Sequence, residues 1–352
     1  MKKLWKGIPI LSLAVVLVLT ACGSNKSNSA NSSNSAPAGS SAPASSAVPE
    51  GPKYNFRLAE THPADYPTTK GDQKFAELVK ERSNGRITID VFPGSQLGEE
   101  KAVIEQVQLG AIEFTRVSAG ALGGFNKEYE AFSLPYIFDN EDHQWKFLNS
   151  EDGTKLLDSL ESSRMKGLAY YSSGSRNFYS SKPLNSIKDL KGLKIRVQQN
   201  KVNIDLMNAL GANATPMPYG EVFGALQTGI IDAAENNFPS YLTSNHYQKA
   251  KNLILDQHQR VPEVLLISKL AWDKLNPEDQ QLIKQAALDS VATQREEWSK
   301  FEKDAEAKVR ESGVNIVEVS DLKPWQDAVK PMIERYRAEF GAILDAIDKA
   351  RN

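Results

Sequence analysis

LKIRVQQNKVNIDLMNALGANATPMPYGEVFGALQTGIIDAAENNFPSY, residues 193–241, is the stretch that decides the fold class. A short β-branched strand around Arg196 leads into a helix that ends at Gly211, and a second short helix ends at Gly229. Strands that alternate with helices in this way predict an α/β unit. Ligands of open α/β sheets bind beyond the carboxyl ends of the strands, so Arg196 and Asn236 are expected at a binding site. Further candidates that follow the two strands are Gln198, Asn237 and Tyr241.

Residues 1–21 predict an export signal that is not part of the fold. Lys2, Lys3 and Lys6 precede an apolar run over residues 8–19, which is too short for a membrane span of about 20 residues. The run ends in Leu-Thr-Ala before Cys22, the only cysteine of the chain. This pattern resembles a bacterial lipoprotein box, in which the cysteine is lipidated and becomes the mature N-terminus. An ordinary signal peptide with an incidental cysteine is the alternative.

Residues 22–52 comprise the lipidation site and a segment that is rich in Ser, Asn, Ala and Pro, with almost no bulky apolar side chain. Such a segment cannot bury enough apolar surface to offset the entropy of ordering, so we expect a flexible tether. The protein is therefore predicted to be extracytoplasmic, either lipid-anchored to the outer face of a cell membrane of the Gram-positive type or periplasmic.

The remaining chain is long enough for two domains. QLGAIE at residues 108–113 is echoed by QTGIID at 227–232, which predicts two similar lobes facing each other across a cleft. We expect lobe I to comprise residues 53–173 and about 262–301, and lobe II to comprise residues 174–261 and about 302–352. Asn276 and Pro277 predict the start of a helix that reaches about Glu311. At about 50 Å, that helix would brace both lobes.

Several functional classes are disfavoured by composition and motif content. Loss of the three lysines of the export signal takes the formal charge from −2 to −5, which argues against a nucleic-acid partner. The motifs G-x-S-x-G, G-x-x-x-x-G-K and G-x-G-x-x-G do not occur in the sequence, and its four histidines have no metal-ligand spacing. We therefore predict no enzyme activity, no catalytic residue, no cofactor and no metal site.

Arginines within predicted strands are the most informative polar residues. Arg196 lies in an apolar strand, where an unpaired charge is costly to bury, and its planar guanidinium matches a carboxylate. A structural ion pair with an internal acid is the alternative. Arg176 has a weaker case, because it could lie at a strand edge in solvent. Asn236 either caps the next helix or binds a ligand, and Tyr219 lies either in the core or in the cleft wall.

Several longer motifs resemble the DctP-type solute-binding proteins of tripartite ATP-independent periplasmic (TRAP) transporters. They are FPGSQLGEE, VQLGAIEF, SLPYIF, NSIKDLKGLKIRV, LGANATPMPYGEVFGALQTG and IIDAAEN, and the similarity covers nearly all of residues 54–321. The resemblance implies an α/β, two-lobed fold of the periplasmic-binding-protein type, with a long helix bracing both lobes, that closes over an organic acid. It also implies a monomer that delivers this acid to the small and large membrane subunits of a TRAP permease.

The resemblance also assigns roles to single residues. Arg196 matches the family's carboxylate-binding arginine, Arg176 a second arginine at the carboxylate, and Asn236 the asparagine of the E-N motif. Tyr219 matches an aromatic position in the cleft. Ser118 stands where sialic-acid-type members carry an acid, and ENNFPSY replaces the commoner ENP. The ligand-binding candidates are Arg196, Arg176, Asn236, Tyr219, Glu100, His62, Arg116, Ser118, Gln198, Asn237 and Tyr241.

With these departures, the sequence is similar to the hexuronate-binding subgroup of the family. We therefore expect a ligand such as glucuronate or galacturonate. A C4-dicarboxylate or another carboxylate is the alternative ligand. An alternative role is that of a sensor subunit that presents the acid to a membrane kinase.

Overall fold

The computed structural model describes residues 51–351. The expected export signal, the lipidation site at Cys22 and all but two residues of the tether therefore lie outside the described residues. Within the described range, no helix combines the length and the apolar character needed to cross a bilayer.

The first of two sheets has five strands. Its order is β2 (Ile87–Phe92), β1 (Tyr54–Ala59), β3 (Phe114–Ser118), β10 (Glu263–Ser268) and β4 (Met165–Tyr171). β1 runs parallel to β2 and β3, whereas β10 runs antiparallel to β3 and β4. The carboxyl ends of β1 and β3 therefore lie at the same edge of this sheet.

The second sheet has six strands. Its order is β11 (Asn315–Glu318), β9 (Asn252–Gln259), β5 (Arg176–Ser180), β8 (Ala233–Asn236), β6 (Lys194–Val197) and β7 (Asn213–Pro216). β6 is parallel to both β7 and β8, and β5 is antiparallel to β8 and β9. The start of β5 and the ends of β6 and β8 thus share one edge.

Short helices connect the strands. Around the first sheet they are α1 (Pro67–Arg82), α2 (Glu100–Gln108), α3 (Ala119–Leu122), α4 (Glu141–Leu148), α5 (Glu151–Ser159) and α9 (Lys269–Trp272), with the 3-10 helices η1 (Lys127–Ser133) and η2 (Leu160–Ser163). Around the second sheet they are α6 (Lys201–Ala209), α7 (Val222–Thr228) and α8 (Phe238–Thr243), with η3 (Ile187–Leu190), η4 (Tyr219–Glu221) and η5 (His246–Gln248). The helices α6 and α7 end before Gly211 and Gly229 in left-handed conformation, as the sequence predicts.

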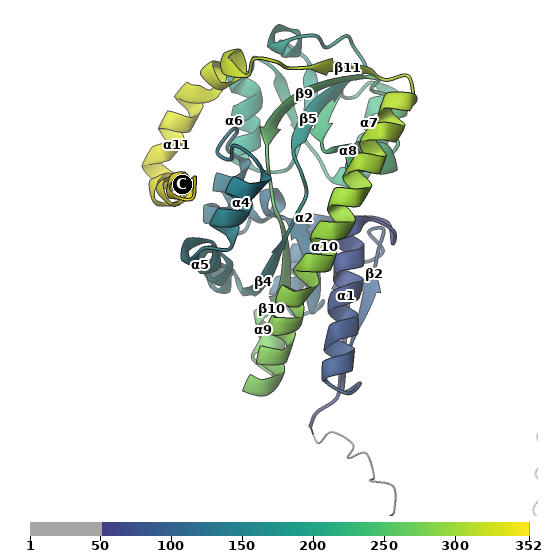
Figure 1. The fold of residues 1–352 in the computed structure, drawn as a ribbon, viewed down its shortest axis with the longest axis vertical. Helices are drawn as coiled ribbons and strands as arrows, with labels where there is room; N and C mark the ends of the chain where they lie inside the picture. Colours follow the sequence, from purple (N-terminus) through teal and green to yellow (C-terminus); the bar gives the residue numbers. More distant parts are fainter. Residues whose placement is uncertain (1–50, 352) are drawn as a thin grey trace, which may run out of the picture. The chain divides into compact units, whose positions relative to one another are not determined.

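The helix α10 (Pro277–Glu311) spans 35 residues and packs on both parts of the fold (Figure 1). The side chain of Asn276 caps it by accepting a hydrogen bond from the backbone of Asp279, and Pro277 is its first residue. Its N-terminal part packs on α1 and β4 beside the first sheet, and it also contacts α8 beside the second. The prediction of two α/β lobes with one long bracing helix is confirmed.

The chain crosses between the two sheets at residues 172–175 and again at 260–262. A hydrogen bond joins these crossings, because the Ser173 hydroxyl donates to the carbonyl of Val261 at a distance of 2.5 Å. Gln294 of α10 holds the first crossing with both ends of its amide: it accepts from the backbone N–H of Ser172 at 2.8 Å and donates to its carbonyl at 2.9 Å.

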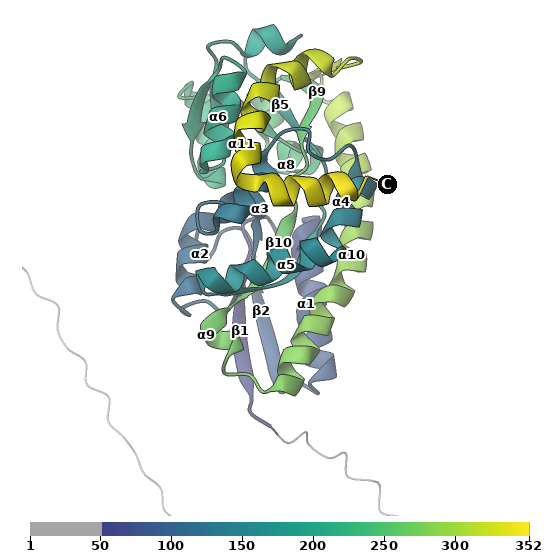
Figure 2. The ribbon, with the colours of Figure 1, turned by 90° about the vertical axis from the view of Figure 1, so that its left-hand side faces the viewer.

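The last helix, α11 (Lys323–Lys349), turns sharply at Phe340, where the backbone leaves the helical region (Figure 2). It packs on α6, η1 and α4, so it contacts elements associated with both sheets. Trp325 and Tyr336 bury its apolar side in a core that also contains residues of both lobes. This contact area adds to the bracing by α10.

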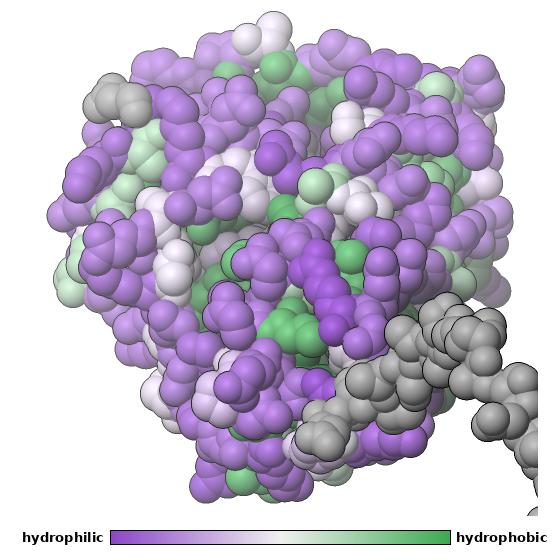
Figure 3. Space-filling view, turned by 60° about the horizontal axis from the view of Figure 1, so that its bottom comes forward, coloured by the Kyte–Doolittle hydropathy of each residue, from purple (hydrophilic) through white to green (hydrophobic). Residues whose placement is uncertain are grey.

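The surface in Figure 3 is mainly hydrophilic, with apolar residues in separate small patches. The exposed large hydrophobic side chains of residues 51–351 are Leu109, Ile230, Leu270 and Leu288. Small, separate patches are normal for a protein surface and do not by themselves indicate an interface.

Candidate functional site

Two adjoining cavities lie between the two sheets, and four residues line both: Glu100, Arg196, Gln198 and Tyr219. The large cavity has a volume of about 230 Å³ and is bounded mainly by α2, α3, the end of β6 and η4. The small cavity, of about 30 Å³, is lined by Thr61, His62, Glu100, Arg116, Ser118, Arg176, Arg196, Gln198, Tyr219, Asn236, Asn237, Ser240 and Glu263. Ten of the eleven candidates from the sequence thus line the small cavity.

Arg196 is buried in β6 with its charge unpaired. Its Nε and Nη2 donate to the carbonyl of Met217 at 3.0 and 2.9 Å, and among residues 51–351 it forms no ion pair. Burial and the nearby Arg176 lower the pKa of its guanidinium, and the ring of Tyr219 lies 5.9 Å away. A buried cation without a counter-ion is costly, so this geometry suits an anionic ligand.

Arg176 lies in β5 and is already paired. It forms a two-pronged ion pair with Glu235 of β8, in which Nη2 lies 2.9 Å from Oε1 and Nε contacts Oε2. Burial alone would raise the pKa of Glu235, but Arg176 and His258 lower it to about 2. Nη1 of Arg176 also donates to the side chain of Asn236 at 3.2 Å. The structure therefore gives Arg176 the internal ion pair that the sequence offered as an alternative for Arg196.

His258 lies behind the ion pair of Arg176 and Glu235, on the side away from the cavity. Its Nδ1 lies 2.8 Å from Asp256, and its Nε2 lies 3.7 Å from Glu235. Burial would lower the pKa of His258, but the two carboxylates raise it to about 9. The ring also stacks on Phe178 at 4.1 Å. His258 is thus a buried imidazolium that supports the orientation of Glu235 and, through it, of Arg176.

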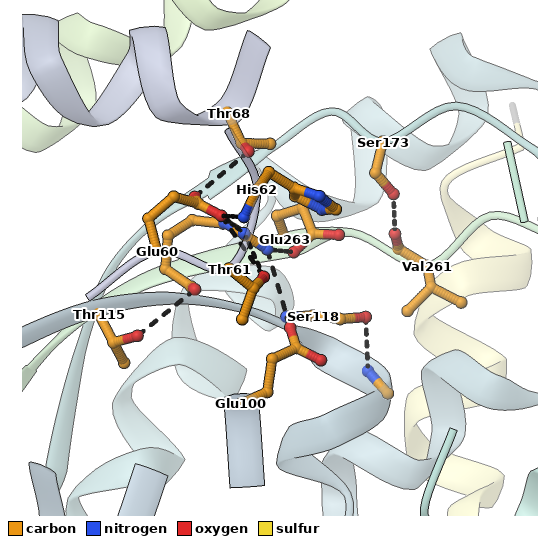
Figure 4. A network of polar contacts seen from close by, with 12 residues as sticks. Glu60, Thr61, His62, Thr68, Glu100, Thr115, Ser118, Ser173, Val261 and Glu263 are labelled. Carbon is orange, nitrogen blue, oxygen red and sulfur yellow. Dashed lines mark hydrogen bonds and ion pairs between the residues drawn. The ribbon is translucent and has the colours of Figure 1, made fainter. Parts of the chain in front are cut away.

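Arg116 of β3 is surrounded by carboxylates. They belong to Glu60, Glu100 and Glu263, which Figure 4 shows gathered in one place. It makes a two-pronged contact with Glu60, with Nε 2.7 Å from Oε2, and its Nη1 lies 2.5 Å from Glu263. Burial would lower the pKa of this guanidinium, but these acids raise it well above its usual value. Arg116 touches the small cavity, but its charge is already compensated by internal acids.

Glu100, the first residue of α2, borders both cavities. Its Oε1 accepts a hydrogen bond from the backbone N–H of Ser118 at 2.7 Å and lies 3.8 Å from Nη1 of Arg116. Burial and the neighbouring Glu263 raise the pKa of Glu100 to about 7. The amide of Gln198 donates to the Ser118 hydroxyl at 2.9 Å, and this contact joins the end of β6 to the end of β3.

His62 and the two asparagines have different environments. His62 stacks on Tyr66 at 3.9 Å, and burial together with Arg116 lowers its pKa to about 3, so the ring is neutral. Asn237 caps α8, because its side chain accepts from the backbone of Ser240 at 2.8 Å. The capping role offered for Asn236 thus belongs to Asn237, and Asn236 lines the small cavity.

Tyr241 is the one candidate that the structure does not bring to the cavities. This side chain is buried in the core of the second lobe, where its ring packs beside Tyr179 and its hydroxyl donates to the carbonyl of Ala250. It lies in α8, and helical geometry turns its side chain away from the edge that carries Asn236. Tyr241 borders neither of the two cavities.

Four polar residues at or behind the site were not selected from the sequence: Glu60, Glu235, His258 and Glu263. Each contacts or flanks a buried arginine or its partner. A signal was available for two of them, because Glu60 directly follows a strand and Glu235 lies within one. Within residues 51–351, no group of His, Cys, Asp and Glu side chains has the arrangement of a metal site.

The sequence of this chain matches a known protein family. The sequence profile of bacterial extracellular solute-binding proteins, family 7 (DctP), matches residues 58–339. A solute-binding protein of Chromohalobacter salexigens is 35% identical over 279 residues, which are 79% of this chain and 83% of the relative.

Two solved structures are similar over most of the fold. A TRAP periplasmic solute-binding protein of Xanthobacter autotrophicus Py2 with bound β-D-galacturonate is 42% identical with a TM-score of 0.81, covering 84% of this chain and 98% of that one. One of Pseudomonas putida F1 with bound D-glucuronate is 41% identical with a TM-score of 0.82, covering 84% and 97%. The chain therefore belongs to the DctP family of bacterial extracellular solute-binding proteins, which serve TRAP transporters.

Proposed function

We propose that this protein captures a hexuronate, such as glucuronate or galacturonate, and delivers it to the small and large membrane subunits of a TRAP permease. The observation that carries the proposal is the buried, unpaired guanidinium of Arg196 beside two adjoining cavities. The hexuronates bound by the two similar proteins support the choice of ligand.

Arg196 would pair with the ligand carboxylate through the N–H groups of its guanidinium edge that do not contact Met217. Asn236 has an amide nitrogen free of protein partners among residues 51–351 and would donate to the same group. Arg176 is held beside Asn236 by Glu235 and donates to its side-chain oxygen, so it would orient the amide of Asn236 without being displaced from its own partner. The ring of Tyr219 would form a wall against the apolar face of the sugar ring.

Titration calorimetry of the purified mature chain tests this function directly. D-Glucuronate and D-galacturonate should bind with a stoichiometry of one and should raise the unfolding temperature. Succinate, a keto acid and sialic acid serve as comparison ligands in the same buffer. If neither uronate binds at millimolar concentration, the proposal is wrong.

We further propose that Cys22 is lipidated, so that the receptor is held at the outer face of a cell membrane as a monomer. The charged and apolar regions before Cys22 support this, and the family is extracytoplasmic. Mass spectrometry of protein purified from membranes should find a diacylglyceryl group at Cys22, and Cys22→Ser should release the protein into the soluble fraction. A Cys22→Ser protein that stays with the membrane would contradict lipid anchoring.

A further inference from the structure

We propose that the cavity accepts acids with a single carboxylate and rejects those with a second negative end, and that Glu100 sets this specificity. The inference rests on the proposed hexuronate function and adds to it a rule for the rest of the ligand. It separates uronates from aldarates, such as galactarate, which carry a carboxylate at both ends, and from C4-dicarboxylates.

Charges around the cavities divide into a basic side and an acidic side. On the basic side, Arg176 is paired with Glu235, whereas Arg196 forms no ion pair among residues 51–351. This side can therefore pair with one carboxylate.

On the acidic side there are more carboxylates than cations. Arg116 makes its close contacts with Glu60 and Glu263, while Glu100 lies farther from it, at 3.8 Å. The one guanidinium is thus shared among three carboxylates, and the partner nearest the large cavity is the least compensated. Figure 4 shows Glu60, Glu100 and Glu263 approaching one another from different elements.

Two hydrogen-bond acceptors on the acidic side have no donor among residues 51–351. Oε1 of Glu100 is occupied by the backbone of Ser118, and its Oε2 has no donor among residues 51–351. Oε1 of Gln198 is buried and also has no donor there, while the amide nitrogen of that side chain donates to Ser118. Two acceptors beside a cavity match hydroxyl groups, which can donate a hydrogen bond.

A second carboxylate would fail at this position for two reasons. It has no hydrogen to donate to either acceptor, and it brings a like charge close to Glu100. A sugar hydroxyl at the same place would donate to Glu100 without any charge repulsion. The arrangement therefore favours polyhydroxy acids with one charged end.

The test compares galacturonate, galactonate and galactarate by titration calorimetry at pH 8. Galactonate is open-chain like galactarate but has one carboxylate, so it controls for loss of the ring. With the unaltered protein, Kd for galactarate should exceed that for galactonate at least about 100-fold, because like charges in contact are strongly unfavourable. With Glu100→Gln, which keeps an oxygen for Ser118, this ratio should narrow at least about tenfold.

Glu81→Gln is the matched control, because Glu81 is exposed on α1 and lines neither cavity. It removes the same charge and should leave the ratio unchanged. An equal narrowing in Glu81→Gln, or no narrowing in Glu100→Gln, overturns the assignment to Glu100. If the unaltered protein binds galactarate as tightly as galactonate, the rule itself is wrong while the uronate function stands. If no uronate binds, the function has failed instead.

Discussion

Arg176 and Arg196 reach the same small cavity from the two strands that flank β8, yet only Arg176 is paired with a carboxylate. Glu235 fixes the orientation of Arg176, whereas Arg196 is held by the neutral carbonyl of Met217. Two arginines in nearly the same place therefore have different roles: one is a structural part of the sheet, and the other is left for a ligand.

Replacement of Arg196 by methionine should abolish tight uronate binding without unfolding the protein. Loss of one partner of a buried charge pair costs about 2 to 5 kcal/mol, so Kd should rise roughly 30-fold to several thousand-fold. Stability without ligand should stay equal or increase, since no ion pair with another residue is lost. Calorimetry and urea denaturation measure the two effects. Arg310→Met, at an exposed ion pair, is the control, and an unchanged Kd in Arg196→Met would remove the central role of Arg196.

Replacement of Glu235 by glutamine should act in the opposite way, mainly on stability. It leaves Arg176 as a buried charge without its carboxylate, which should lower the free energy of unfolding by about 3 to 5 kcal/mol. Glu306→Gln removes an acid from the exposed pair with Arg310 and should cost no more than about 1 kcal/mol. Equal losses in the two variants, measured by urea denaturation, would show that burial of the Arg176 pair has no special weight.

The pH dependence of stability should report the charge of His258. Its pKa is raised from 6.5 to about 9, so its contribution is fully present below pH 6.5 and is lost as the pH rises through 9. The loss should be on the order of 3 kcal/mol. His62 and His246 have a pKa lowered to about 3, so their contribution is lost instead as the pH falls below 6.5.

His258→Gln isolates this effect, because the other two histidines are unchanged in the variant. The difference in unfolding free energy between the two proteins should shrink between pH 6.5 and 9. A constant difference across that range would mean that His258 is not charged in the folded protein.

Replacement of Gln198 by alanine should speed ligand release. The variant loses the hydrogen bond to Ser118 that joins the end of β6 to the end of β3. A bond of this kind contributes about 0.5 to 1.5 kcal/mol, so koff should rise roughly two- to twelvefold. Stopped-flow displacement measures koff, and Gln248→Ala, at an exposed site in η5, is the control. If koff is the same in both variants, the Gln198 contact does not hold the ligand in place.

The sequence predicts the elements whose residues follow a regular period, and it fails where buried residues are polar. β9 was not predicted, because NLIL at its start is followed by DQHQ, which looks like a solvated turn. In the fold, Asp256, His258 and Gln259 are buried because they are bonded to one another or to nearby residues. A single sequence does not reveal such partners, since they come from distant segments.

The positions of the cavity residues could be predicted from the sequence better than their ion pairs. Position beyond a strand end was enough to place Arg196 and Asn236 at the small cavity, whereas Tyr241, one turn into a helix, faces the core instead. Which arginine would be paired could not be predicted, because the pairing depends on the register of β5 against β8. That register places Glu235 beside Phe178, within reach of Arg176.

The side-chain amide of Gln294 forms hydrogen bonds with both backbone groups of Ser172, where the chain leaves the first sheet. This point of the chain is therefore held on α10. Sliding of one sheet past the other would break these two hydrogen bonds, whereas rotation about Ser172 would keep them. A small change of a backbone torsion angle at Ser172 therefore produces a displacement of the second sheet that increases with distance from Ser172. Substitution of Gln294 should accordingly change the rate at which the two sheets move relative to each other while leaving the residues that line the cavities in place.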